Sequence, residues 1–319
     1  MTPVERSNPP DEGDAPGALM ARLARPTAET PTRLAVVSDV HLSVNEHGTR
    51  KVFHRTEERL RTAVEDANAL GVDGVLLGGD LTKDGERADF ERFDEVLAGL
   101  EPPFVAIPGN HDVPKAFDDH PVPGLDRFAE RYTPGELPFV TRFGGVDLVC
   151  LDSETMPDGS LAETWEGRVS AAQLEWLRDT LPDVPNPVVC VHHNLSRLPE
   201  VAAFEGYPWE WYPILNAEEL VEGLSAHDVP LVLSGHHHLP ATSFTRGVRE
   251  IVAPATCSFP QAYLLVDVDS EGTTVWLVPL ADRDGIREAY TYARKGGATD
   301  RGILEMALTR LERFPLVSE

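Results

Sequence analysis

Positive charge is scarce in this sequence of 319 residues, and lysine is the scarcer of its two sources. Only four of the 28 basic residues are lysines, namely Lys51, Lys83, Lys115 and Lys295. Against them stand 53 acidic residues spread along the chain, which gives a net charge of −25. A surface with this charge repels polyanions at low salt. We therefore expect no nucleic acid partner and no binding to anionic membranes.

Long apolar runs and a cysteine framework are also missing. No apolar run reaches the ~18 residues of a membrane-spanning helix. The first residues, MTPVERSNPPDEGD, lack the basic and apolar regions of a secretory signal. Of three cysteines, Cys150 and Cys190 lie within apolar runs, which suits buried thiols better than disulfides. We expect a globular, cytoplasmic protein without a disulfide framework.

The acidic, lysine-poor composition resembles that of proteins from organisms with a molar-salt cytoplasm. At about 1 M salt the Debye length falls to ~3 Å, so the surface charge no longer repels an anionic substrate. A halophilic protein is one interpretation of this composition, and an ordinary acidic mesophilic protein is the alternative.

Three parts of the chain differ in composition. Residues 1–32 are rich in proline, threonine and acids, and we interpret them as a mobile leader with a short helical stretch around Ala18–Arg25. Residues 33–280 alternate apolar runs with amphipathic stretches, including a helix predicted from Thr56, its N-cap, to Gly71. Three strand-like runs then follow in succession, which predicts a mixed α/β fold with two packed sheets. Residues 281–319 have the pattern of a helical C-terminal tail packed on this domain.

Asp, Asn and His residues follow five of the apolar runs. Asp39 and His41 follow LAVVS, Asp80 follows VLLGG, Asn110, His111 and Asp112 follow FVAIPG, His192 and His193 follow PVVCV, and His236, His237 and His238 follow PLVLSG. Open α/β sheets form their ligand sites at the carboxyl ends of strands. A single histidine in such a place is usually a surface or core residue. Five such strand ends together predict one site.

The spacing of these residues indicates a metal site. Alternate residues of an extended segment point the same way, so Asp39 and His41 are expected to converge, as are His236 and His238. His237 is then expected to point elsewhere. Since no cysteine stands at these positions, the donors are nitrogen and oxygen, which suit a catalytic site for Mn, Fe, Zn or Co.

The motifs D-x-H, G-D, G-N-H-D, H-H and G-H-x-H occur in that order between Asp39 and His238. With them the chain resembles the calcineurin-like metallophosphoesterases, and most of all their cyclic-nucleotide phosphodiesterase-like branch. The resemblance implies a four-layer αββα sandwich of two mixed sheets flanked by helices. It also implies a dinuclear metal centre at the strand carboxyl ends and hydrolysis of a small phosphodiester or phosphomonoester by water.

The resemblance assigns roles to individual positions. Asp39, His41 and His238 resemble ligands of one metal, Asn110, His192 and His236 resemble ligands of the other, and Asp80 resembles the carboxylate that bridges both. His111 resembles the non-ligand histidine that contacts the phosphate or the leaving oxygen. Two divalent ions ~3.5–4 Å apart lower the pKa of water, so that hydroxide is available near neutral pH to attack phosphorus.

Some positions depart from the family pattern or leave alternatives open. Members with an Asp three residues after the bridging carboxylate use it to orient the non-ligand histidine, but here Lys83 stands there, followed by Asp84. Segments 113–140 and 195–215 are expected to border the substrate pocket. The second contains Tyr207, Trp209, Trp211 and Tyr212, which either stack on a nucleobase or pack the loop onto the body. A non-catalytic scaffold and a nuclease of the same superfamily are the alternative functions.

Overall fold

The computed structural model describes residues 16–156, 160–162, 165–196, 198 and 213–319. The aromatic residues Tyr207, Trp209, Trp211 and Tyr212 lie outside these ranges, so their expected role stays a prediction.

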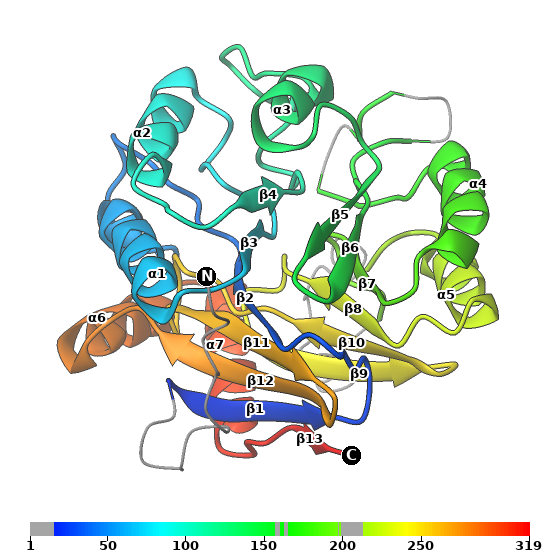
Figure 1. The fold of residues 1–319 in the computed structure, drawn as a ribbon. Coiled ribbons are helices and arrows are strands. Elements are labelled where there is room, and N and C mark those ends of the chain that lie inside the picture. Colours follow the sequence, from blue (N-terminus) through cyan, green and yellow to red (C-terminus); the bar gives the residue numbers. More distant parts are fainter. Residues whose placement is uncertain (1–15, 157–159, 163–164, 197, 199–212) are drawn as a thin grey trace.

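Two mixed β-sheets form the centre of the molecule (Figure 1). The strands are β1 Ala18–Leu23, β2 Thr32–Val37, β3 Gly74–Leu77, β4 Phe104–Ala106, β5 Phe139–Phe143, β6 Val146–Cys150, β7 Pro187–Cys190, β8 Leu231–Ser234, β9 Ala241–Thr245, β10 Val248–Val252, β11 Ala262–Asp269, β12 Gly272–Pro279 and β13 Val317–Ser318. The seven-stranded sheet has the order β13-β1-β12-β11-β2-β3-β4, and the six-stranded sheet has the order β5-β6-β7-β8-β10-β9.

Helices cover the outer faces of both sheets. They are α1 Thr56–Leu70, α2 Arg87–Leu97, α3 Leu125–Tyr132, α4 Ala171–Thr180, α5 Ala217–Ala226, α6 Arg283–Lys295 and α7 Ala298–Leu311, with 3-10 turns at Phe53–Arg55 and Leu181–Asp183. Figure 1 shows α1 and α2 on one side of the paired sheets and α4 and α5 on the other. This arrangement confirms the predicted four-layer αββα sandwich. Within the described ranges, every helix is too short or too polar to cross a membrane.

Three apolar layers hold these four layers together. Successive residues of a strand face opposite sides of its sheet, so Val36 and Leu76 pack between the sheets, whereas Val37 and Leu77 pack under α1 and α2. A third layer joins α4 and α5 to the outer face of the six-stranded sheet. Near-continuous apolar runs such as LAVV and LVLS arise because these strands are buried on both faces.

The structure corrects the prediction for the N-terminal segment. Ala18–Leu23 is strand β1, which pairs antiparallel with β12 and parallel with β13, and its Met20 and Ala21 are fully buried. The prediction of a helical stretch around Ala18–Arg25 is therefore wrong. The residues of β1 also belong to the core and not to a leader outside it. The reason is tertiary, because the partner strands lie about 250 to 300 residues further along the chain.

Smaller features of the sequence prediction also need adjustment. Helix α1 begins at Thr56, but its N-cap residue is Arg55 rather than Thr56. Gly71 ends the helix as predicted, in a left-handed conformation with φ of 57°. The three cysteines are free and buried.

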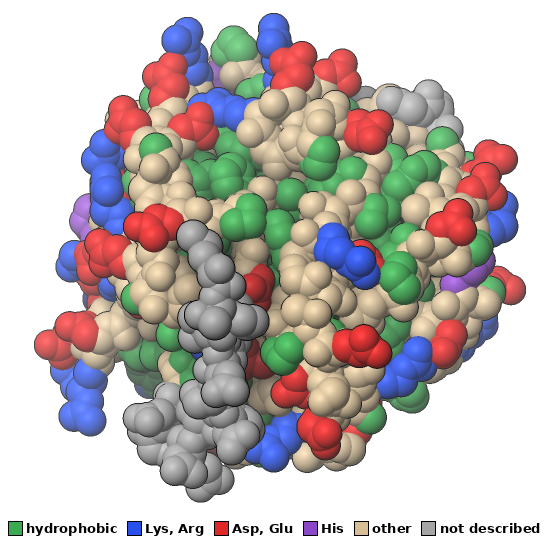
Figure 2. Space-filling model, viewed as in Figure 1, with side chains coloured by type: hydrophobic (Ala, Val, Ile, Leu, Met, Phe, Trp, Pro, Cys, Tyr) green, Lys and Arg blue, Asp and Glu red, His purple; other side chains and the backbone are tan. Residues whose placement is uncertain are grey.

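Acidic side chains are widely distributed on the molecular surface. On the face that Figure 2 shows, they are interspersed with arginines and lysines over the visible elements instead of forming one block. On this face the negative charge is therefore not confined to one element.

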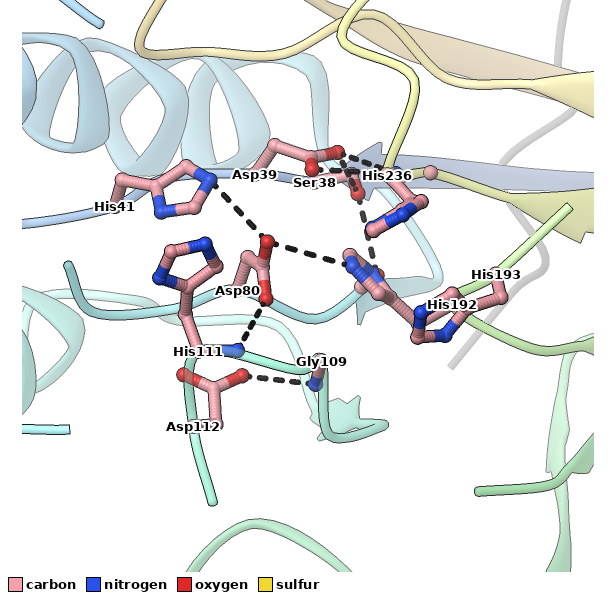
Figure 3. Close-up of polar contacts among 12 residues, drawn as sticks. Ser38, Asp39, His41, Asp80, Gly109, His111, Asp112, His192, His193 and His236 are labelled. Atoms are coloured by element: carbon pink, nitrogen blue, oxygen red, sulfur yellow. Dashed lines mark hydrogen bonds and ion pairs between the residues drawn. The ribbon is translucent and has the colours of Figure 1, made fainter. Parts of the chain in front are cut away.

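Strand directions explain where the polar motifs meet. Strands β2, β3 and β4 run parallel in one sheet, and β6, β7, β8 and β10 run parallel in the other. The loops that follow β2, β3, β4, β7 and β8 carry the five motifs. Side chains from all five loops meet in one cluster (Figure 3).

Candidate metal centre

The turns after the strands have unusual backbone conformations. Asp39, His41, Asp80, His236 and His238 have positive φ values of 53°, 46°, 53°, 64° and 59°. Left-handed conformations are uncommon for residues other than glycine and cost about 1–3 kcal/mol each, so they persist where the surrounding structure imposes them. The sequence prediction assumed that these pairs lie on extended segments. This assumption is wrong, because left-handed turns orient the side chains instead.

Four residues converge on the side of the site formed mainly by the seven-stranded sheet. Ligand-type atoms of Asp39, His41, Asp80 and His238 lie within 4.8 Å of one another, and all four side chains are buried. His41 Nε2 lies 3.2 Å from Asp80 Oδ2. His238 Nε2 lies 3.2 Å from Asp39 Oδ1. This group has two carboxylates and two imidazoles, a donor set that suits a divalent transition metal.

A second group lies on the other side of Asp80. Asp80, His192 and His236 place ligand-type atoms within the same 4.8 Å limit, with His192 Nε2 at 3.4 Å from Asp80 Oδ2. The other ring nitrogen of His192 lies 2.7 Å from the carbonyl oxygen of Gly78 and donates to it, so Nε2 is the nitrogen that would offer a lone pair to a metal ion. Figure 3 shows Asp80 between His41 on one side and His192 on the other. Asp80 is the residue that both groups share.

Two buried polar atoms of predicted ligands support a metal at the site. Asn110 Oδ1 and His192 Nε2 are buried and have no hydrogen-bond partner in the structure. Buried polar atoms without partners are rare, and each costs about 1–3 kcal/mol unless an ion or water satisfies it. An amide oxygen and an imidazole nitrogen are both good ligands for divalent cations, so the residues present fit a metal ion.

The charges of the site favour a cation. Burial and the neighbouring Asp80 raise the pKa of Asp39 to about 6. Burial lowers the pKa of His192, but the carboxylates of Asp80 and Asp39 outweigh it and raise this pKa to about 10. Burial is the largest cause of the Asp39 shift, whereas the His192 shift comes from two buried carboxylates that lie close together and stabilise a positive charge nearby.

His111 belongs to neither ligand group but borders both. Its backbone N–H donates to Asp80 Oδ1 at 2.9 Å. Its Nδ1 lies 2.5 Å from the carbonyl oxygen of Lys83 and 3.1 Å from Asp84 Oδ1. Because both partners are acceptors, Nδ1 carries the proton and Nε2 has the lone pair. Asp84 is thus the carboxylate beside His111, although the family pattern places it one residue earlier.

An aromatic surface adjoins His111. The ring of Trp165 stacks on His111 with centroids 4.5 Å apart, and Phe117 lies 4.7 Å from Trp165. Phe117 is about half exposed, at 53%. Segment 113–140 thus approaches the site through Phe117.

The sequence prediction gave no role to three further residues near the site. The carboxylate of Asp112 accepts hydrogen bonds from the backbone N–H groups of Leu81, Thr82 and Gly109, and so joins two of the loops. Cys257 Sγ lies 3.7 Å from His238 Nδ1, but burial raises its pKa to about 12, so it is a neutral thiol. Lys51 Nζ lies 3.3 Å from both His41 Nδ1 and His111 Nε2. Only Asp112 belongs to a motif that could have revealed it.

The remaining motif histidines occupy other environments. His237 is fully buried and belongs to neither ligand group, in keeping with its expected orientation. His193 lies on the far side of the second group, with Nδ1 at 2.8 Å from Ser153 Oγ and Nε2 at 2.8 Å from the carbonyl oxygen of Trp165. It therefore supports the loop that carries Trp165.

Comparisons with known proteins agree with this geometry. The family model described as calcineurin-like phosphoesterase matches residues 32–240. A probable cyclic nucleotide phosphodiesterase of Synechococcus is 27% identical over 264 residues, which cover 80% of this chain and 95% of the relative. The 3′,5′-cyclic adenosine monophosphate phosphodiesterase CpdA of Escherichia coli is 27% identical over 243 residues, covering 72% of this chain and 78% of the relative.

Among solved structures, a dimetal phosphatase from Danio rerio is similar with a TM-score of 0.60 and 15% identity. The match covers 78% of this chain and all of that one. At this identity the likeness concerns the fold, which these proteins share.

Proposed function

This chain belongs to the calcineurin-like phosphoesterase family, and we propose that it hydrolyses small phosphodiesters, 3′,5′-cyclic nucleotides foremost, at a centre of two divalent metal ions. Metal-dependent hydrolysis of phosphoric esters is the activity of the family. The choice of a cyclic nucleotide rests on the curated relatives, several of which have this substrate in their names. Monoesters are the alternative substrates.

One observation carries the dinuclear proposal, namely that Asp80 is common to two separate ligand groups. In this proposal Asp39, His41 and His238 hold one ion, while Asn110, His192 and His236 hold the other. When bound, such ions neutralise charge on phosphate oxygens and increase the acidity of water. Mn, Fe, Zn and Co all suit this set of nitrogen and oxygen donors.

The chain itself supplies a proton donor or hydrogen-bond donor for the reaction. The Lys83 carbonyl oxygen and the Asp84 carboxylate fix the proton of His111 on Nδ1, so Nε2 is the nitrogen available to a substrate. Burial and Lys51 lower the pKa of His111, and the carboxylates of Asp80 and Asp84 oppose this shift. A protonated His111 can then give its Nε2 proton to the departing oxygen.

Neither alternative function gains support from a specific observation. A scaffold has no need of two convergent ligand groups, or of a buried amide oxygen without a hydrogen-bond partner such as Asn110 Oδ1. The net charge of −25 opposes binding to a nucleic acid backbone.

A screen of phosphoesters tests the proposal. The Mn-loaded protein is assayed at low and at molar KCl with bis(p-nitrophenyl) phosphate, cyclic nucleotides, glycerophosphodiesters and nucleoside monophosphates. We expect turnover of diesters, and its loss in Asp80→Ala and Asn110→Ala. Asp119→Asn is the matched control, because the side chain of Asp119 is fully exposed. Unchanged turnover in Asp80→Ala would contradict the mechanism, and turnover of monoesters alone would contradict the substrate class.

A further inference from the structure

Lys51 is held close to the centre by the loop between β2 and α1. Its backbone forms an isolated antiparallel bridge with Ser258, and the N–H of the next residue, Val52, donates to the carbonyl oxygen of Cys257 at 2.8 Å. The hydroxyl of Ser258 lies 3.1 Å from His238 Nδ1. Lys51 thus extends from backbone that is itself tied to the metal-ligand loops, and its side chain is partly buried.

Among the described residues, the Lys51 ammonium contacts imidazoles and no carboxylate. Nζ lies 3.3 Å from His111 Nε2 and 3.3 Å from His41 Nδ1. Over the part of the chain that the structure describes, Lys51 forms no ion pair. By contrast, Lys83 lies 2.7 Å from Asp84 and Lys115 lies 2.9 Å from Glu154. In a chain with 53 acidic residues, a partly buried lysine without an acidic partner is a notable exception.

The hydrogen-bonding groups around Nζ leave room for an acceptor. His111 Nε2 has a lone pair and can accept one N–H of the ammonium. Nε2 of His41 faces Asp80 and His238, and if it binds the proposed ion, Nδ1 would carry the proton and could not accept another. In the metal-loaded site Lys51 and His41 would then present two donors to each other, and an anionic oxygen between them would satisfy both.

We propose that Lys51 binds a non-bridging oxygen of the substrate phosphate, next to His111 Nε2. This inference rests on the proposed function, since it names a phosphate-binding residue of the same site. Lysine suits the task because its ammonium is a compact charge with three donors on a flexible stem. Charge-assisted hydrogen bonds are the stronger kind, so we expect losing this one to weaken phosphate binding roughly 10- to 100-fold.

Substitutions test this role in the Mn-loaded full chain. Lys51→Met removes the charge at similar length, Lys51→Arg keeps it, and Lys295→Met removes the exposed lysine at the end of α6 as a matched control. The measurements are metal content, kcat and KM for bis(p-nitrophenyl) phosphate, and the inhibition constant of orthophosphate. We expect Lys51→Met to keep two metals, to lower kcat/KM and to weaken orthophosphate inhibition by the same order. Lys51→Arg should recover part of the kcat/KM and part of the orthophosphate inhibition. Lys295→Met should match the wild type in both quantities.

A labelling experiment tests the same role without turnover. Because the chain has four lysines, peptide mass spectrometry can follow each one after brief reaction with an amine-acylating reagent. Orthophosphate should protect Lys51 in the Mn-loaded wild-type protein and leave Lys295 unprotected. The labelling experiment tests phosphate binding by Lys51 even if no tested ester is hydrolysed. A failure of this inference can therefore be told apart from a failure of the proposed function.

Three results would overturn the inference. The first is unchanged kcat/KM and unchanged orthophosphate inhibition in Lys51→Met with full metal content. The second is loss of metal in Lys51→Met, which would make Lys51 a support for His41. The third is equal labelling of Lys51 with and without orthophosphate. If Lys51→Met fails to fold, the kinetics of Lys51→Arg and the labelling of the wild-type protein still test the role of Lys51.

Discussion

The Nε2 atoms of His41 and His238 face each other at 3.2 Å, although His41 follows a strand of one sheet and His238 follows a strand of the other. Burial lowers the pKa of both imidazoles well below the usual value, so both rings are neutral. Each neutral ring can offer one lone pair, and a cation between the two Nε2 atoms would be attracted by both lone pairs. Metal binding would therefore join the two sheets.

We expect divalent metal to stabilise the fold through this pair. A ligand present at about 100 times its Kd adds about 2.7 kcal/mol to the free energy of unfolding. Thermal unfolding with Mn or with a chelator should show this gain in the wild type and a much smaller one in His41→Ala and His238→Ala. His237→Ala is the control, because His237 belongs to neither ligand group, and it should retain two metals per chain. A metal defect in His237→Ala as large as in its neighbours would contradict the ligand assignment.

Gly109 is predicted to be necessary for the position of Asp80. A Cβ at residue 109 would lie 2.2 Å from Asp80 Oδ1, so Gly109→Ala must displace the carboxylate or the loop. We expect lower metal content and lower turnover in this variant, measured by elemental analysis and by the diester assay. Gly124→Ala is the matched control, because a Cβ there has no neighbour within 4 Å. Full metal occupancy in Gly109→Ala would contradict this prediction, because it would show that the loop can move without displacing Asp80.

Asp84 is predicted to matter most for poor leaving groups. Its carboxylate lies 3.1 Å from His111 Nδ1 and favours the protonated ring. General acid catalysis contributes about 10²–10⁴-fold, and its share grows as the leaving oxygen becomes more basic. Asp84→Ala should therefore lose roughly 10- to 100-fold in kcat with alkyl diesters and much less with p-nitrophenyl diesters. Equal losses with both leaving groups would contradict proton donation by His111, and Asp119→Asn controls for the loss of a nearby charge.

The buried pair of Lys115 and Glu154 is predicted to set part of the acid stability. Their charged atoms lie 2.9 Å apart, with side chains 2% and 0% exposed. Burial raises the pKa of Glu154, but Lys115 and His193 outweigh it and lower this pKa to about 2. Because the folded pKa lies below the ordinary 4.5, the pair stabilises the protein above pH 4.5 and the contribution disappears as the pH falls toward 2.

Substitution of the pair tests this linkage. Lys115→Met leaves a buried carboxylate without its partner and should cost about 3–5 kcal/mol in the free energy of unfolding at pH 7. The double variant Lys115→Met with Glu154→Gln should recover much of this loss and should lose less stability than the wild type between pH 4.5 and 2. Denaturant unfolding at several pH values measures both effects. A double variant as unstable as the single one would contradict the pairing as the cause.

Salt is predicted to stabilise the protein. With a net charge of −25, the folded chain repels itself at low ionic strength, and molar salt shortens the Debye length to about 3 Å. The melting temperature should rise and diester turnover should increase between about 0.1 M and molar KCl. Indifference of both to KCl would rule out the halophilic interpretation and leave the ordinary acidic one.

The sequence alone determined the fold class and the residues that gather at the site. Buried strands appear as apolar runs because both faces of each sheet are covered, and the polar residues after those runs stand out against them. Asp39, Asp80, Asn110 and the histidines are therefore visible in the printed sequence as a set.

Tertiary structure decided what depends on distant contacts. Strand β1 is a strand because β12 and β13 pair with it from the far end of the chain. Left-handed turns aim Asp39 and His41 at one point, and a path through the β2–α1 loop brings Lys51 beside His111. Asp84 reaches His111 because the loop after Asp80 turns its carboxylate inward. Local patterns carry no information on such approaches, since they arise only when the loops of two sheets are packed against each other.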